Sequence, residues 1–138
     1  MQTFVPAETF LECAQILDYR RLGKQRVECL QILNALEGQD SAWRHHPATL
    51  MWQGFEAALR RYQAAMIQEW VRRGYQNTMV IPNTGGRAKM PPWWGGPIHS
   101  SHRSALLYKD YNYYKQFRWR ERPKLAYIWP ISKSGVPE

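Results

Sequence analysis

Apolar residues recur at helical spacing through the first third of the chain. After Pro6, which is suited to open a helix, the spacing predicts a short first helix from the apolar set Phe10, Leu11, Ala14, Ile16 and Leu17. A second helix is predicted from the apolar stripe Leu22, Val27, Leu30, Leu33 and Leu36, with a different face formed by Arg21, Lys24, Gln25, Glu28 and Gln31. Gly23 lowers helix propensity near its start, so the pattern leaves that boundary open. A loop is expected at residues 37–41.

The third and longest predicted helix runs from Pro47 to about Arg73, where Gly74 is suited to end it. Its expected core face is Leu50, Met51, Phe55, Ala58, Leu59, Tyr62, Met66, Ile67, Trp70 and Val71. Residues 76–97 contain four Pro and four Gly without a helical period, which predicts a long surface loop. A short helix at 100–108, an aromatic turn or helix at 111–117 and an extended tail at 125–131 complete the chain.

No repeat and no strand pairing is visible in this pattern, which therefore predicts an all-α fold. We expect a compact single-domain bundle of three main helices, with long loops and an irregular aromatic C-terminal part, over residues 1–138. A length of 138 residues is enough to bury an apolar core without a second domain.

Charge and cysteine content narrow the class of partner and the compartment. The chain has 19 Lys and Arg against 11 Asp and Glu, a net charge of +8 and a pI near 9.8, which favours a polyanionic partner such as nucleic acid. Cys13 and Cys29 form no CxxC pair, so we expect them to be reduced and buried. No apolar run of 18 residues and no signal-peptide pattern is present, and we therefore expect a cytoplasmic protein without a membrane partner.

The densest candidate chemistry is a basic segment at the start of the second helix. Arg20, Arg21, Lys24 and Arg26 surround Glu28 within nine residues. Lys24 and Glu28 are four residues apart, so an ordinary surface salt bridge worth a few tenths of a kcal/mol, about 0.3–0.5, is one interpretation. The other is a phosphate-binding face that contains a catalytic carboxylate.

All four histidines fall into two pairs, His45 with His46 and His99 with His102. A metal site is conceivable, but no cysteine is near and adjacent histidines rarely both bind one ion. Contacts to phosphate, or hydrogen bonds that position a substrate, are the preferred interpretation.

Two aromatic segments suggest contacts with nucleic-acid bases. Residues 91–97 read Pro-Pro-Trp-Trp-Gly-Gly-Pro, which is either a wedge that fills a gap left by an extruded nucleotide or a hydrophobic clasp that fixes the loop to the core. Basic and aromatic residues alternate from Arg103 through Lys109 to Lys115, as in grooves that follow a nucleic-acid strand.

The chain resembles the pyrimidine-dimer DNA glycosylase family. The matching pieces are Tyr19-Arg20, Leu22, Arg26-Val27, the long helix ending in residues 69–75 and the aromatic patch at 111–114. A closer resemblance, to an uncharacterised bacterial and phage branch of that family, is carried by residues 21–28, 45–48, 51–52, 91–93 and 101–104.

That resemblance implies a helical glycosylase with a strand-cleaving lyase activity. In the family, the N-terminal amine attacks C1′ of the deoxyribose, a glutamate assists and arginines hold phosphates. An α-amine suits this role because its ordinary pKa lies below that of a lysine side chain. Here the bulky Gln2 should leave Met1 in place, and Arg21 stands where the family has its glutamate, so Glu28 is the candidate carboxylate.

The resemblance therefore suggests a DNA repair enzyme, a DNA glycosylase with or without an AP-lyase step, that excises a damaged or modified pyrimidine. The alternatives are a non-catalytic DNA-binding module of the same fold and a metal-dependent enzyme that uses the histidines. We expect DNA as partner, no cofactor, no bound metal, a monomer, and the cytoplasm of a bacterium or of a phage-infected host. The expected catalytic residues are Met1, Glu28, Lys24 and His46. The expected DNA contacts are Arg20, Arg21, Gln25, Arg26, His45, Trp52, Trp93, His99, His102, Arg103 and Lys109.

Overall fold

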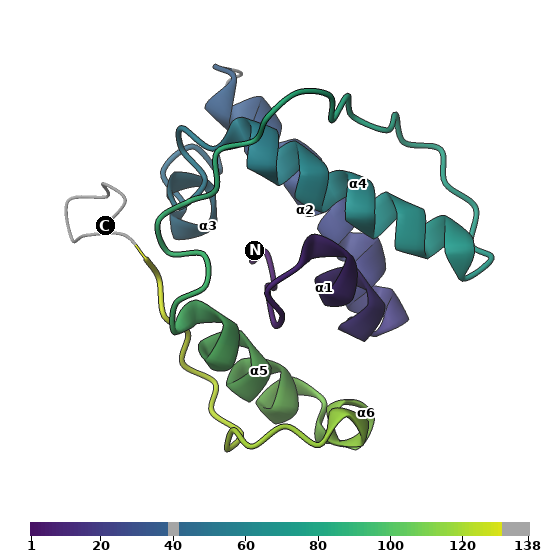
Figure 1. Cartoon of the computed structure of the whole chain (residues 1–138), viewed down its shortest axis with the longest axis vertical. Helices are drawn as coiled ribbons and strands as arrows, with labels where there is room; N and C mark the ends of the chain where they lie inside the picture. The colour runs from purple at the N-terminus through teal and green to yellow at the C-terminus, as the bar shows by residue number, and fades with distance from the viewer. Residues whose placement is uncertain (39–41, 131–138) are drawn as a thin grey trace.

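The computed structural model describes residues 1–38 and 42–130 (Figure 1). Within these ranges the chain forms six α-helices and one 3-10 turn, and no strand. In chain order they are α1 (Phe10–Ile16), α2 (Tyr19–Leu36), α3 (Pro47–Leu50), α4 (Glu56–Arg72), α5 (Ile98–Lys109), α6 (Tyr111–Tyr114) and the 3-10 turn η1 (Lys115–Phe117). The predicted all-α class is confirmed.

The main packing is that of α4 against α2 and α1. Apolar side chains from the facing stripes fill the space between them, among them Leu22, Cys29, Ile32, Leu59, Tyr62 and Met66. In Figure 1, α5 and α6 lie below this group, and the N-terminal segment, defined as residues 1–6, runs between the two parts. Residues 2–6 of that segment are buried although they form no helix. The first residues therefore sit inside the molecule.

The single long helix expected from Pro47 to Arg73 is wrong, because the chain forms two helices there. Residues 51–54 make a turn between α3 and α4, and Gly54 has a φ of +87°, outside the right-handed helical region. The predicted end is confirmed. Gly74 has a φ of +94°, and the N–H of Tyr75 donates to the carbonyl of Trp70 at 3.2 Å, which closes the end of α4.

The expected apolar stripe of α2 is also partly wrong. Val27 and Leu30 are 45% and 43% exposed, whereas Gln25 and Cys29 are buried. The helix begins at Tyr19 and continues through Gly23, with the Asp18 side chain accepting a hydrogen bond from the N–H of Arg21. A methyl group at position 23 would come within 3.0 Å of the Trp70 ring, so glycine is what lets α4 approach α2 here.

The remaining elements are close to expectation. Thr9, not Pro6, caps the first helix, since Pro6 lies in the buried N-terminal segment. Residues 76–97 form a loop without helix or strand, and α5 and α6 with η1 cover the predicted short helices. Residues 39–41 and Ile131, which fall in the expected loop and tail, lie outside the described ranges. Over the described ranges, none of the helices has the length and apolar character needed to cross a bilayer.

Candidate active site

The N-terminal segment is held by side chains from α2, from α4 and from the turn between α3 and α4. The Gln25 amide accepts a hydrogen bond from the N–H of Phe4 at 2.7 Å and donates one to the carbonyl of Gln2, also at 2.7 Å. The Tyr62 hydroxyl reaches the Phe4 carbonyl at 2.6 Å, and Trp52 Nε1 donates to Thr3 Oγ1 at 2.9 Å. These contacts satisfy backbone groups that would otherwise be buried without partners. They fix the path of the chain up to its first residue.

On its other side the same segment is held by α5. The N–H of Val5 donates to Nδ1 of His102 at 2.9 Å, and Nδ1 of His99 lies 2.7 Å from the Val5 carbonyl. His99 Nε2 accepts from the N–H of Gly95, so Nδ1 carries the hydrogen and donates it to Val5. Burial, with a smaller contribution from His99, lowers the pKa of His102 to about 3, so its ring is neutral near pH 7. Both histidines act on the protein's own backbone.

A pocket of about 400 Å³ opens where the N-terminal segment meets α2. The segment contributes Met1, Gln2 and Phe4 to its lining, and α2 contributes Arg20, Arg21, Lys24, Gln25 and Glu28. Lys109 at the end of α5 and Tyr127 from the C-terminal part complete it. Residues that are far apart in the sequence thus converge on the first residue. Three of the four expected catalytic residues, Met1, Lys24 and Glu28, line the same pocket, and the fourth, His46, does not.

Glu28 is the carboxylate of this pocket. Its Oε2 accepts hydrogen bonds from the N–H of Gln2 and from Nε2 of Gln25, each at 3.2 Å. Lys24 Nζ lies 3.9 Å from Glu28 Oε1, and the Lys24 side chain is 74% exposed whereas that of Glu28 is 15% exposed. The lysine contact is therefore loose, and the defined partners of the carboxylate are the backbone of residue 2 and the Gln25 amide.

His46 lies within electrostatic reach of the same groups. Burial lowers its pKa, the positive charge of the N-terminal amine lowers it further, and Glu28 acts in the opposite direction. Its Nδ1 accepts a hydrogen bond from the N–H of Ala48 at 3.0 Å and caps α3, which leaves the hydrogen on Nε2. His46 is therefore placed to donate a hydrogen bond, and the neighbouring His45 is exposed.

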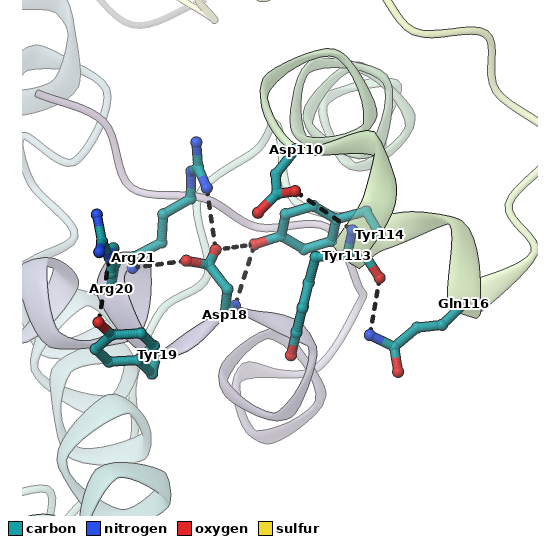
Figure 2. A network of polar contacts seen from close by, with 8 residues as sticks. All are labelled: Asp18, Tyr19, Arg20, Arg21, Asp110, Tyr113, Tyr114 and Gln116. Atoms are coloured by element: carbon teal, nitrogen blue, oxygen red, sulfur yellow. Dashed lines mark hydrogen bonds and ion pairs between the residues drawn. The ribbon is translucent and has the colours of Figure 1, made fainter.

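The four arginines expected to contact phosphate differ in their exposure and in the protein groups that they bind. Arg20 is exposed and lines the pocket, with its Nε 3.2 Å from the Tyr19 hydroxyl. Figure 2 shows that Arg21 is held by Asp18, which also accepts a hydrogen bond from the Tyr114 hydroxyl of α6. Burial raises the pKa of Asp18, but these hydrogen bonds, the positive charge of Arg21 and the hydrogen bond from its backbone N–H together outweigh burial, so the pKa of Asp18 lies below the ordinary value. Asp18 stays ionised and keeps Arg21 oriented.

The other two arginines are engaged elsewhere. The Arg26 guanidinium lies 4.1 Å from the centre of a Trp70 ring and donates to Asn77 Oδ1 at 2.7 Å. Arg103 makes a two-point ion pair with Glu121 at 3.0 and 2.9 Å and donates to the Pro6 carbonyl at 2.9 Å. Neither lines the pocket.

The two expected tryptophan contacts lie in the core. Trp52 is fully buried and Trp93 is 7% exposed; their rings meet edge to face at 5.0 Å, and Trp93 Nε1 donates to the Met51 carbonyl at 3.0 Å. Residues 91–97 thus form the hydrophobic clasp that was the alternative to a DNA wedge. We do not assign DNA contacts to Trp52, Trp93, His99 or His102, because all four side chains are buried inside the fold.

Sequence reasoning missed Gln2, Phe4 and Tyr127 as pocket residues. For Gln2 and Phe4 the available signal was their place next to the proposed nucleophile. For Tyr127 no pattern in the sequence joins the tail to α2. Within residues 1–38 and 42–130, no three His, Cys, Asp or Glu side chains converge to hold a metal ion, so the metal-dependent alternative has no ligand set there.

Comparison with known proteins identifies the family. No curated protein and no solved structure matches the chain. The family model described as pyrimidine dimer DNA glycosylase matches residues 1–83, which include Met1, Glu28 and His46 but not α5 or the tail. Since this match covers more than half of the 138 residues, the chain belongs to the pyrimidine dimer DNA glycosylase family, and this membership implies DNA glycosylase activity with DNA as the substrate.

Proposed function

We propose that this protein excises a damaged or modified pyrimidine from DNA by attack of the Met1 α-amine on C1′ of the deoxyribose, with Glu28 assisting. The hydrogen bond from the N–H of Gln2 to Glu28 Oε2, at 3.2 Å, is the observation that carries the proposal. It places the first residue of the chain beside the carboxylate of a cation-lined pocket. We take residues 1–138 to be one glycosylase domain that acts as a monomer.

The chemistry has two stages. The amine nitrogen bonds to C1′, the bond from C1′ to the base breaks, and the base leaves with the electron pair and takes up a proton. The amine then loses one proton, its nitrogen forms a double bond to C1′ as the bond from C1′ to the ring oxygen O4′ breaks, and O4′ takes up a proton, so that an iminium ion joins the protein to the opened sugar. Loss of a proton from C2′ next breaks the C3′–O bond and cleaves the strand. A carboxylate next to this centre stabilises the iminium charge and accepts protons from the amine and the sugar.

The rest of the pocket supports that chemistry. Arg20, Lys24 and Lys109 give it an exposed positive rim for the phosphates on each side of the reacting nucleotide. Arg21 adds a charge whose direction Asp18 fixes. His46 is not among the lining residues but lies within electrostatic reach of the amine and Glu28; with its hydrogen on Nε2 it is suited to donate a hydrogen bond to the substrate and not to serve as the base.

Lys24 is the lysine of the pocket that lies near Glu28. Lysine nucleophiles are activated by desolvation, and the side chain of Lys24 is 74% exposed, which favours Met1 for the covalent step. Lys24 is better suited to contact phosphate.

Sodium borohydride trapping on a duplex with one abasic site tests the proposal. The wild type should form a covalent complex, and chemical acetylation of the N-terminus should prevent it. The Lys24→Ala variant should still be trapped, at a level reduced only by weaker DNA binding. No trapping of the wild type on abasic or pyrimidine-dimer DNA would contradict the lyase step, and loss of trapping only in Lys24→Ala at saturating DNA would move the nucleophile to Lys24.

A further inference from the structure

The chain after η1 turns back and runs along α5, as the yellow-green trace in Figure 1 shows. We call residues 121–130 the C-terminal strap. The N–H of Lys124 donates to the Ser104 carbonyl at 3.2 Å, and the N–H of Ile128 donates to Ser101 Oγ at 2.8 Å. These bonds set the register of the strap on the helix. The strap lies outside the residues that match the family model.

The start of the strap is fastened by charge. Glu121 pairs with Arg103 at two points and accepts a hydrogen bond from Ser100 Oγ at 2.8 Å. The hydrogen bonds from Arg103 do most to hold the pKa of Glu121 below its ordinary value, and burial opposes them only in part. Because Arg103 also binds the Pro6 carbonyl, one guanidinium connects the strap to the N-terminal segment.

This register delivers Tyr127 to the pocket. Its ring centre lies 6.0 Å from that of Phe4 and 5.9 Å from that of His102, and Lys109 Nζ lies 5.7 Å from the ring centre. On its other side the ring lies 5.8 Å from Trp129, which in turn lies 5.9 Å from His46. Tyr127 therefore connects the pocket lining to the histidine near the N-terminal amine.

The aromatic surface of the pocket lining belongs to two residues, Phe4 and Tyr127. Phe4 is 6% exposed and belongs to the core, whereas Tyr127 is partly exposed. Polar side chains make up most of the remaining lining, and polar groups suit phosphates and the sugar rather than the flat face of a base. Bases stack on aromatic side chains whatever their sequence, because every base has a π face.

From this arrangement we propose that a nucleobase at the reaction site stacks on the ring of Tyr127. The C-terminal strap, which carries Tyr127, would then make the pocket bind a nucleotide that has a base more tightly than an abasic nucleotide. The inference rests on the proposed function, because it takes the pocket to be the place where the reacting nucleotide is held. It assigns to the strap a role in substrate selection, while the covalent chemistry stays with Met1 and Glu28.

Two matched DNA probes test the inference by fluorescence anisotropy at one fixed salt concentration. Each is a duplex with a single-nucleotide bulge, which holds a thymidine in one probe and a tetrahydrofuran abasic analogue in the other. The wild type should bind the thymidine probe more tightly. Tyr127→Ala should reduce this preference about tenfold, in the range measured when stacking aromatics are replaced by alanine. Tyr127→Phe should keep it, because it retains the ring.

A matched control is Tyr108→Ala, since Tyr108 lies on α5 but is 57% exposed and does not line the pocket. It should bind both probes like the wild type. Should Tyr127→Ala fail to fold, Tyr127→Leu keeps apolar bulk without the π face and should show the same loss. An unchanged preference in Tyr127→Ala or Tyr127→Leu, or a wild type without any preference, would overturn the inference.

The outcome is separable from that of the proposed function. Borohydride trapping on abasic DNA needs the amine but no base. Loss of trapping together with a preference that depends on Tyr127 would contradict the covalent chemistry alone. Normal trapping without such a preference would contradict the role of Tyr127 alone.

Discussion

Two groups of polar residues that look alike in the sequence have different surroundings in the structure. The pocket group, Arg20, Lys24 and Glu28, lies on α2, and both of its cations are exposed. The segment-holding group, His99, His102 and Arg103, lies on α5. The two histidines form hydrogen bonds with the backbone of Val5, and Arg103 donates to the Pro6 carbonyl and to Glu121. Both groups are clusters of titratable residues in a basic chain. What separates them is that the first group lines the pocket, whereas the second group does not line it and instead holds the N-terminal segment and the strap.

The comparison teaches that the second group acts on the site indirectly. His99 and His102 hold the segment that ends at Met1, so they place the amine without touching the pocket. Substitutions in the pocket group should therefore change chemistry or DNA affinity with little effect on stability. Substitutions in the segment-holding group should change stability first.

The largest expected effect on activity is that of Glu28→Gln. The amide keeps an acceptor for the N–H of Gln2 but removes the negative charge, so strand cleavage of abasic DNA should fall by about 100-fold or more. Gel-based single-turnover assays measure this, with melting temperature and DNA affinity as controls. If the protein were a non-catalytic binding module, the Glu28→Gln variant would bind DNA as well as the wild type or better, and neither protein would cleave DNA. Full cleavage by the variant would remove Glu28 from the mechanism.

The next effect is a pH dependence of stability, which should come from His102 of the segment-holding group. The pKa of His102 is lowered from 6.5 to about 3 by burial, so between these values the unfolded state binds a proton that the folded state does not. The free energy of unfolding should therefore fall as pH is lowered from 6.5 towards 4.5, by up to about 1.4 kcal/mol per pH unit. Urea unfolding at several pH values measures the slope. His102→Asn, whose side-chain oxygen can replace Nδ1 as acceptor, should flatten it, and an equal slope in both proteins would count against this account.

The smallest effects are expected from replacing one arginine of each group, and these two substitutions should change different quantities. Arg20→Ala should lower the slope of log affinity for duplex DNA against log salt by about one, because a phosphate contact is lost, with the melting temperature unchanged. Arg103→Ala should leave that slope as it is and lower the melting temperature by about 5 °C, because two carboxylate bonds and one backbone bond disappear. The reverse pattern would invalidate the division into two groups.

Local patterns were sufficient for most of the fold. Helical spacing, the glycine at position 74 and the loop composition of residues 76–97 each report on neighbours in the sequence, and these features are confirmed. The stripe of α2 was wrong for a reason outside the helix. Gln25 is buried because backbone groups of the N-terminal segment need its amide, and no periodicity within residues 19–36 records that need.

In the candidate site, too, the features that depend on neighbours in the sequence could be predicted, and those that depend on distant residues could not. Glu28 lines a pocket with Met1, which agrees with the second interpretation of the basic segment, a phosphate-binding face that contains a carboxylate. The expectation for Trp93 misread a buried clasp as a surface wedge, since Pro, Trp and Gly are common to both. Tyr127 was beyond reach, because its place depends on how the strap is fastened to α5 by Ser101, Ser104 and Glu121.

The buried N-terminal segment also has a consequence for the order of folding. Its partners, Gln25, Tyr62 and His102, lie 21, 58 and 97 residues away along the chain from Phe4 and Val5. During synthesis the backbone groups of Val5 and Pro6 must wait for α5 before they have hydrogen-bond partners, and contacts of such sequence separation slow folding. The helices α1, α2 and α4 can associate earlier, so the pocket is among the last parts of the molecule to form. A chain stalled before residue 98 would carry the whole of the matched family region and still lack the α5 partners of Val5 and Pro6.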